Sequence, residues 1–106
     1  MPEYRTLDNL EEEYFRTHPE EIDPYMVEIF EEFAKDGDSG AFLASLRTIA
    51  RVKGISTLAQ ETGMTRQGLQ KALSAKGNPR LESVNAIMKA LGYRLTPQKL
   101  EPRHVE

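Results

Sequence analysis

The stretch from Ile55 to Leu73 decides the fold, and it reads ISTLAQETGMTRQGLQKAL. Thr57, followed three residues later by Gln60, has the spacing of a capping box, which predicts that a short helix begins there. Gly63 predicts the end of this helix, because glycine adopts the positive φ of a sharp turn without strain. Thr65 then caps a second helix, whose buried side would carry Leu69, Ala72 and Leu73. Two short helices joined by a tight turn of this kind form a helix-turn-helix.

Side-chain size and polarity along this stretch indicate what the two helices bury and what they expose. Ala59 is small enough for the helices to cross closely, and the wedge between them would be filled by Leu58, Met64 and Leu69. The exposed side of the second helix would then carry Arg66, Gln67, Gln70 and Lys71. In the major groove, arginine and lysine pair with guanine and glutamine pairs with adenine, so we predict that these four side chains read base edges. Gly68 costs about 1 kcal/mol of helix propensity. We interpret its missing side chain as a way to leave room for the DNA backbone or a thymine methyl group.

Basic and hydroxyl-bearing residues flank the two helices and predict contacts with DNA phosphates. The residues assigned to phosphate are Ser56, Thr57, Thr65, Lys53, Lys76 and Arg80, and Arg51 adds a further positive charge before the motif. Ser56 and Thr57 stand at the start of the first helix of the motif, where backbone N–H groups are free to bind a phosphate. The alternative is ordinary surface charge, and we keep that interpretation for Lys89, Arg94 and Lys99.

The charge of the chain is divided between its two parts. The 106 residues carry a formal net charge of -3. Residues 1–38 hold 13 acidic and 3 basic residues, a balance of −10, whereas residues 39–106 hold 4 acidic and 11 basic residues, a balance of +7. Such asymmetry suggests a basic functional surface with an acidic appendage. The competing interpretation is two solvated faces without a partner.

Hydrophobic spacing predicts helices through nearly all of the remaining chain. A first short helix would be capped by Thr6 or Asp8, with Leu7, Leu10 and Tyr14 on one side. A second would begin at Asp23 and Pro24 and carry a stripe of Met26, Ile29, Phe30 and Phe33. A third, capped by Asp38 or Ser39, would run over 40–53, and a last one over 80–91 with Leu81, Val84, Ile87, Met88 and Leu91 facing inward. Residues 93–96 alternate like a short C-terminal strand. We therefore expect an all-α fold of five to six helices.

The length of the chain favours a single compact unit with three segments. Residues 1–38 would form an acidic N-terminal helical extension packed on the core, residues 39–96 a helix-turn-helix DNA-binding domain, and residues 97–106 a frayed tail. The extension allows three interpretations: a buttress that completes the core through Phe30 and Phe33, a docking surface for a basic toxin, or an aid to dimerisation that keeps negative charge away from DNA.

Several functional classes fit the sequence poorly. There is no cysteine, which excludes disulfides, thiolate metal sites and thiol catalysis. His18 and His104 are far apart in the sequence and neither has a set of partners, so we expect no enzyme, no metal site and no cofactor. The longest apolar run is the four residues 41–44, and the acidic N-terminus does not resemble a signal peptide. We expect a cytoplasmic protein with no membrane partner.

Residues 40–92 resemble the Cro/CI-type (XRE) helix-turn-helix domain. A narrower resemblance, over about 19–96, is to the HigA-like addiction-module antidote family of phage-type DNA-binding proteins. Its most specific part extends from Gly63 through Lys76-Gly77-Asn78-Pro79 to Ala90-Leu91-Gly92. The resemblance implies a lambda-repressor-like fold and a prokaryotic repressor encoded beside a RelE/ParE-like toxin. Thr62, Ala72 and the strand-like Tyr93-Arg94-Leu95 depart from the broader pattern, and the last departure leaves the dimer contact open.

These observations lead to one main hypothesis and two alternatives. The main one is a homodimeric, sequence-specific transcriptional repressor that binds a double-stranded DNA operator. It would be the antitoxin of a type II toxin–antitoxin system and would regulate its own operon. The alternatives are a stand-alone phage-type transcriptional regulator and a protein that acts mainly as a toxin-binding interaction module.

Overall fold

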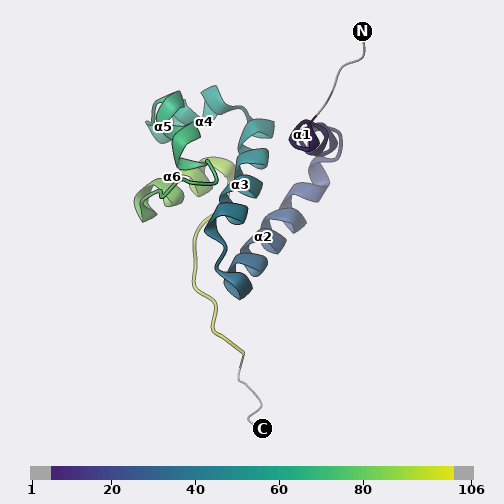
Figure 1. Ribbon diagram of the computed structural model, residues 1–106, viewed down its shortest axis with the longest axis vertical. Helices are drawn as coiled ribbons and strands as arrows, with labels where there is room; N and C mark the ends of the chain where they lie inside the picture. Colours follow the sequence, from purple (N-terminus) through teal and green to yellow (C-terminus); the bar gives the residue numbers. More distant parts are fainter. Residues whose placement is uncertain (1–5, 102–106) are drawn as a thin grey trace.

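A computed structural model describes residues 6–101 of the chain and shows an all-α fold. Its six α-helices and one short 3-10 helix (η1) are α1 (Leu7–Thr17), η1 (Pro19–Glu21), α2 (Ile22–Asp36), α3 (Ser39–Lys53), α4 (Ile55–Thr62), α5 (Arg66–Ala72) and α6 (Leu81–Leu91). In Figure 1, α3 passes through the centre, with α1 and α2 on one side and α4, α5 and α6 on the other. The prediction of an all-α fold of five to six helices is confirmed.

Three of the helix starts follow from side-chain caps that the sequence predicts. Thr6 caps α1 and forms a reciprocal capping box with Asn9. The Asp38 carboxylate accepts a hydrogen bond from the Ala41 N–H at 3.1 Å at the start of α3. The Thr65 hydroxyl plays the same part for α5. Such caps satisfy backbone donors that have no partner within the helix, and each is worth about 1 kcal/mol.

Two predicted helix starts are wrong. Helix α2 begins at Ile22, directly after η1, so Asp23 lies in its first turn and Pro24 is tolerated there because a first-turn N–H has no intrahelical partner. Helix α4 begins at Ile55 after Gly54, without a side-chain cap. The expected capping box of Thr57 with Gln60 is absent, because the chain is already helical two residues before Thr57.

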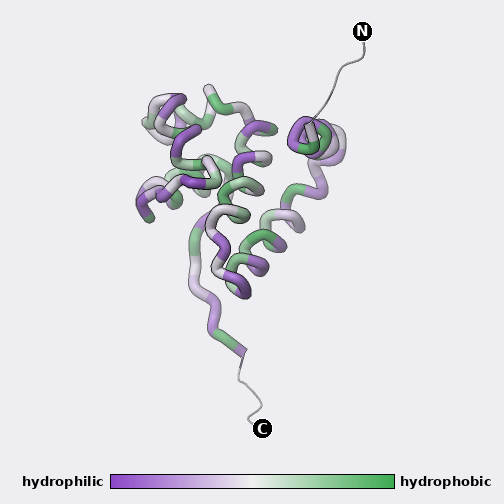
Figure 2. The backbone as a smooth tube through the Cα atoms, viewed as in Figure 1, coloured by the Kyte–Doolittle hydropathy of each residue, from purple (hydrophilic) through white to green (hydrophobic). Residues whose placement is uncertain are grey.

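The core lies where α3 meets the helices on both of its sides. Leu46 and Ala50 of α3 are fully buried, and so are Leu58 of α4, Leu69 of α5 and Ile87 of α6. Hydrophobic and hydrophilic stretches alternate along the helices, as Figure 2 shows, so each helix turns one face toward this core. Each leucine or isoleucine side chain that is wholly removed from water contributes about 1.5–3 kcal/mol, so these residues dominate the stability of the fold.

Helix α1 turns toward solvent the side that carries its aliphatic residues. Leu7, Leu10 and Tyr14, which share one side of the helix as the sequence predicts, are exposed by 72%, 50% and 46%. Glu12 and Phe15 are buried instead. The ring of Phe15 packs against Tyr25 of α2, with ring centroids 4.7 Å apart, and this contact turns the other side of α1 outward. The aliphatic stripe of α1 is therefore a surface feature.

The C-terminal part of the chain also differs from the prediction. Leu81 at the start of α6 is 76% exposed, although its spacing suggested a core residue. Residues 93–96 form no strand, because no neighbouring strand within residues 6–101 pairs with them. Tyr93 and Leu95 instead pack against the core, and the Tyr93 hydroxyl donates a hydrogen bond to the Asp23 carboxylate. Residues 1–5 of the expected N-terminal segment, and residues 102–106 of the tail with His104, lie outside the described residues.

Candidate nucleic-acid interface

Helices α4 and α5 are joined by a turn whose geometry follows from one glycine. Gly63 has φ 76° and ψ 11°, the left-handed conformation that other residues adopt only with strain. The Met64 N–H then donates to the Ala59 carbonyl at 3.1 Å, which closes the turn. Ala59 is 6% exposed at the crossing, so its small side chain lies between the helices. The turn fixes the direction in which α5 leaves α4.

The exposed side of α5 carries the four residues predicted to read bases. Leu69 is fully buried, which fixes the rotation of this short helix about its axis. The side chains on the opposite side, Arg66, Gln67, Gln70 and Lys71, are all exposed. Within residues 6–101, neither Arg66 nor Lys71 takes part in an ion pair. The structure thus brings these four side chains together on one solvent-facing surface, which we call the α5 surface.

Gly68 lies directly beside the cap of α5. A Cβ atom at this position would lie 3.0 Å from the Thr65 hydroxyl oxygen, a tight contact. That hydroxyl accepts the hydrogen bond of the Gly68 N–H at 2.9 Å. The Thr6 cap of α1 accepts the N–H of Asn9 at the same position of its helix, so a cap of this kind also accommodates a side chain.

The residues predicted to bind phosphate lie at the end of α3, at the start of α4, at the cap of α5 and in the loop that follows α5. Ser56 and Thr57 occupy the first turn of α4. Their backbone N–H groups have no acceptor within the helix, because its first hydrogen bond runs from the Leu58 N–H to the Gly54 carbonyl. Lys53 ends α3 and lies 3.9 Å from Glu61. All of the predicted phosphate-binding residues, Lys53, Ser56, Thr57, Thr65, Lys76 and Arg80, are exposed.

The loop after α5 folds back against the end of that helix. A Cβ atom on Gly77 would lie 2.6 Å from the Ala72 carbonyl oxygen and 2.7 Å from that of Lys71, so only glycine fits. The loop and α5 together line a surface hollow of about 630 Å³, with Lys71, Lys76 and Arg80 around it. Arg80 also lies 3.6 Å from Glu82, and both side chains are exposed. Sequence reasoning gave Gly77 no role of its own, although a Gly-Asn-Pro run is a typical turn signal.

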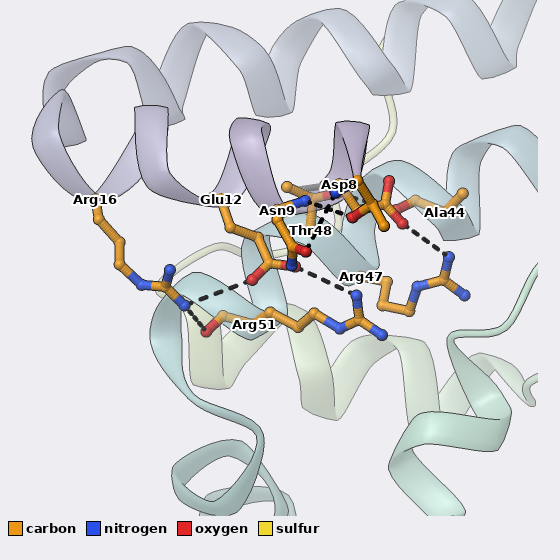
Figure 3. A network of polar contacts seen from close by, with 9 residues as sticks. Asp8, Asn9, Glu12, Arg16, Ala44, Arg47, Thr48 and Arg51 are labelled. Carbon is orange, nitrogen blue, oxygen red and sulfur yellow. Dashed lines mark hydrogen bonds and ion pairs between the residues drawn. The ribbon is translucent and has the colours of Figure 1, made fainter. Parts of the chain in front are cut away.

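Arg51, predicted as a flanking positive charge, faces the other side of the molecule. Its guanidinium lies 3.2 Å from the carboxylate of Glu12, whose side chain is only 9% exposed (Figure 3). Arg16 of α1 donates to the Arg51 carbonyl at 3.3 Å and lies 3.6 Å from Glu12. Arg47 lies 3.8 Å from Asp8. The positive charges of Arg47 and Arg51 on α3 therefore pair with α1 and do not contribute to the α5 surface.

The remaining chemistry of the described residues is sparse. His18 stacks on the ring of Tyr14 with centroids 4.3 Å apart. Within residues 6–101, no group of three or more His, Asp or Glu side chains is arranged to hold a metal ion. None of the helices in this part of the chain combines the length and the apolar character that crossing a membrane requires. The arrangement that can act chemically is the α5 surface, which offers several hydrogen-bond donors and positive charge.

Comparisons with known proteins match most of the chain, including helices on both sides of α3. A family model described as "Probable addiction module antidote protein" matches residues 6–99. A protein of Haemophilus influenzae, described as uncharacterized, is 39% identical over 83 residues, which cover 78% of this chain and 81% of that protein. No solved structure matches the chain significantly.

Proposed function

The chain belongs to the family of probable addiction module antidote proteins, and from this premise we propose that it represses transcription by binding an operator through a helix-turn-helix formed by α4 and α5. Helix α5 would enter the major groove as the recognition helix of a lambda-repressor-like, XRE-type domain. Residues 39–96 would form this domain, with residues 1–38 as the acidic extension and residues from 97 onward as the tail.

The observation that carries the proposal is the composition of the α5 surface. Arg66, Gln67, Gln70 and Lys71 are exposed together on one side of one helix, and the two cations have no ion-pair partner among residues 6–101. Arginine and glutamine offer the donors that match guanine and adenine edges, so these side chains would select the sequence. Contacts from Lys53, the start of α4 and the loop with Lys76 and Arg80 would fix position on the phosphates.

A homodimer would place two recognition helices about 34 Å apart, in successive major grooves of a palindromic operator. Membership of the antidote family supports a toxin as second partner. We propose that this toxin is RelE/ParE-like and that the protein regulates its own operon. A stand-alone phage-type regulator is the nearest alternative, and the reading frame beside the gene distinguishes the two. A small basic protein encoded there favours the antidote role.

The experiment is a fluorescence anisotropy titration of a duplex from the promoter region of the gene, with a scrambled duplex for comparison. Arg66→Ala or Gln67→Ala should relax base preference and weaken operator binding by about 1–3 kcal/mol, since each removes a contact to a base edge. Lys89→Ala on α6 is the matched control, because it also removes one exposed positive charge. If wild type and variants bind every duplex equally, the proposal is wrong.

A further inference from the structure

A groove with an aromatic floor runs between α2 and α3, on the opposite side of α3 from the α5 surface. Its volume is about 280 Å³, and Tyr25, Phe33 and Phe42 line it. The rings of Phe33 and Phe42 have centroids 5.2 Å apart, and Phe33 is 38% exposed. Exposed aromatic side chains in a groove favour a partner that covers them.

The edge of the same groove is acidic. Glu28, Glu32 and Asp36 follow one another at four-residue spacing along α2, and Asp38 faces them from the start of α3. All four carboxylates are exposed, and none of them forms an ion pair with another described residue. The residues that line the groove include no lysine or arginine. We call this feature, with its aromatic floor and its four carboxylates, the acidic groove.

The three carboxylates of the acidic groove that lie on α2 repel one another in the free protein, whereas the fourth, Asp38, also caps α3. Like charges at i and i+4 on a helix destabilise it by a few tenths of a kcal/mol per pair. Burial raises the pKa of Tyr25 above its ordinary value, and the charges of Glu11, Glu28 and Asp8 raise it further, against a lowering effect of the hydrogen bond with Ser45. Of the carboxylates that line the groove, Glu28 is the one whose charge contributes to this shift. A cationic occupant would relieve the repulsion between the carboxylates of α2.

We propose that the acidic groove is the docking site for an arginine-bearing amphipathic segment of a basic partner protein. This inference rests on the proposed function, in which the partner is the toxin of the module. An arginine guanidinium stacks on aromatic rings and forms bidentate hydrogen bonds with carboxylates. It therefore fits both the aromatic floor and the acidic edge of the groove. Apolar residues beside the arginine would cover Phe33.

Other occupants match the acidic groove less well. DNA phosphates would be repelled by the four carboxylates. A second copy of this chain could offer the cations of its α5 surface, but that contact joins two different surfaces. Contacts of this kind extend into filaments unless the rotation closes a ring, and they would cover the surface assigned to DNA. A separate basic protein leaves the α5 surface free.

The test uses the full chain, labelled with ¹⁵N, and a synthetic helical peptide with arginine and leucine on one face. The peptide should shift NMR signals of residues 25–45 that line the acidic groove. The double variant Glu32→Gln/Asp36→Asn should weaken peptide binding at least about tenfold, because interfacial charge pairs of this type are strongly coupled. Glu20→Gln/Glu21→Gln is the matched control, since it removes two exposed carboxylates outside the groove. It should change the affinity by less than about twofold.

Several outcomes would overturn the docking proposal. Equal weakening by the control variant would indicate unspecific attraction to an acidic protein, and signal shifts on α1 or α6 alone would place the peptide elsewhere. A lower oligomeric state of the Glu32→Gln/Asp36→Asn variant in sedimentation would assign the groove to a second copy of the chain. The variant itself should fold, because it removes like-charge repulsion between exposed side chains.

Operator binding, measured on the same samples, separates this inference from the proposed function. Both double variants should bind the operator with an affinity within about twofold of the wild-type value, since these carboxylates lie away from α5. A wild-type protein that binds the operator but not the peptide overturns the docking site alone. One that binds the peptide at the groove but shows no operator preference overturns the repressor role alone.

Discussion

The α5 surface and the contact between α1 and α3 both contain positive charges, but those charges have different surroundings. On α5, Arg66 and Lys71 point to solvent and pair with no carboxylate among residues 6–101. On α3, Arg47 and Arg51 lie within 4 Å of Asp8 and Glu12. The comparison shows that a cation is available to a partner only if the fold places no acidic helix opposite it. The +7 balance of residues 39–106 is therefore shared between an internal contact and an open surface.

The largest expected effect is on the free energy of unfolding, and it distinguishes a buried leucine beneath the α5 surface from a half-exposed leucine on α1. Leu69→Ala should lower the free energy of unfolding by about 2–5 kcal/mol, because the fully buried side chain leaves a cavity beneath the α5 surface. Leu10→Ala, the matched change on the outward side of α1, should cost no more than about 0.5 kcal/mol, since Leu10 is 50% exposed. Urea denaturation measures both. A large cost for Leu10→Ala would mean that the outward side of α1 is buried in an interface.

A smaller effect on stability distinguishes a cation that pairs with α1 from a cation that is exposed to solvent. Arg51→Ala should lower the free energy of unfolding by about 1 kcal/mol, because it removes the nearer of the two guanidinium groups that face the largely buried Glu12 carboxylate and leaves only Arg16 beside it. The same variant should change DNA affinity by less than about twofold, whereas Lys76→Ala should weaken DNA binding and reduce its salt dependence. Urea denaturation and anisotropy titrations at several salt concentrations give the two quantities.

A double-mutant cycle with Glu12→Gln tests whether the stability effect belongs to the ion pair. The effects of the two single changes should sum to more than the effect of the double change, because both remove the Arg51–Glu12 ion pair, while Glu12→Gln also removes the pair with Arg16. If the effects of Arg51→Ala and Glu12→Gln on stability are additive, the contact between α1 and α3 does not depend on this pair.

The smallest effect concerns the hydrogen bond that joins the C-terminal segment to α2. Burial, the hydrogen bond to Asp23 and the charge of Asp23 together raise the pKa of Tyr93 from 10.0 to about 12, with burial as the largest cause. Because the folded pKa lies above the unfolded one, the stabilisation is complete below pH 10 and is lost as pH rises from 10 to about 12. Tyr93→Phe should cost about 0.5 kcal/mol at neutral pH. Urea denaturation below and above pH 10 should show a shallower decline for the variant, and parallel declines would contradict the assignment.

Local sequence signals predicted most of the helical structure and the composition of the candidate site. Thr6, Asp38 and Thr65 cap the helices that were expected to follow them, and Gly63 adopts the left-handed turn. The exposure of Arg66, Gln67, Gln70 and Lys71 follows from the spacing of Leu69 and Leu73 alone. Caps, turns and helical spacing depend on residues within a few positions of one another, so the sequence contains them in full.

The sequence by itself therefore determined the all-α class, the turn between α4 and α5 and the uneven distribution of charge. Only the tertiary structure decided that α1 buries Glu12 and exposes Leu10, that Arg51 faces α1, and that residues 93–96 find no partner strand among residues 6–101. The physical reason is that each of these outcomes depends on which element lies opposite. An ion pair between residues 39 positions apart, or a ring contact between α1 and α2, leaves no periodic pattern in the chain.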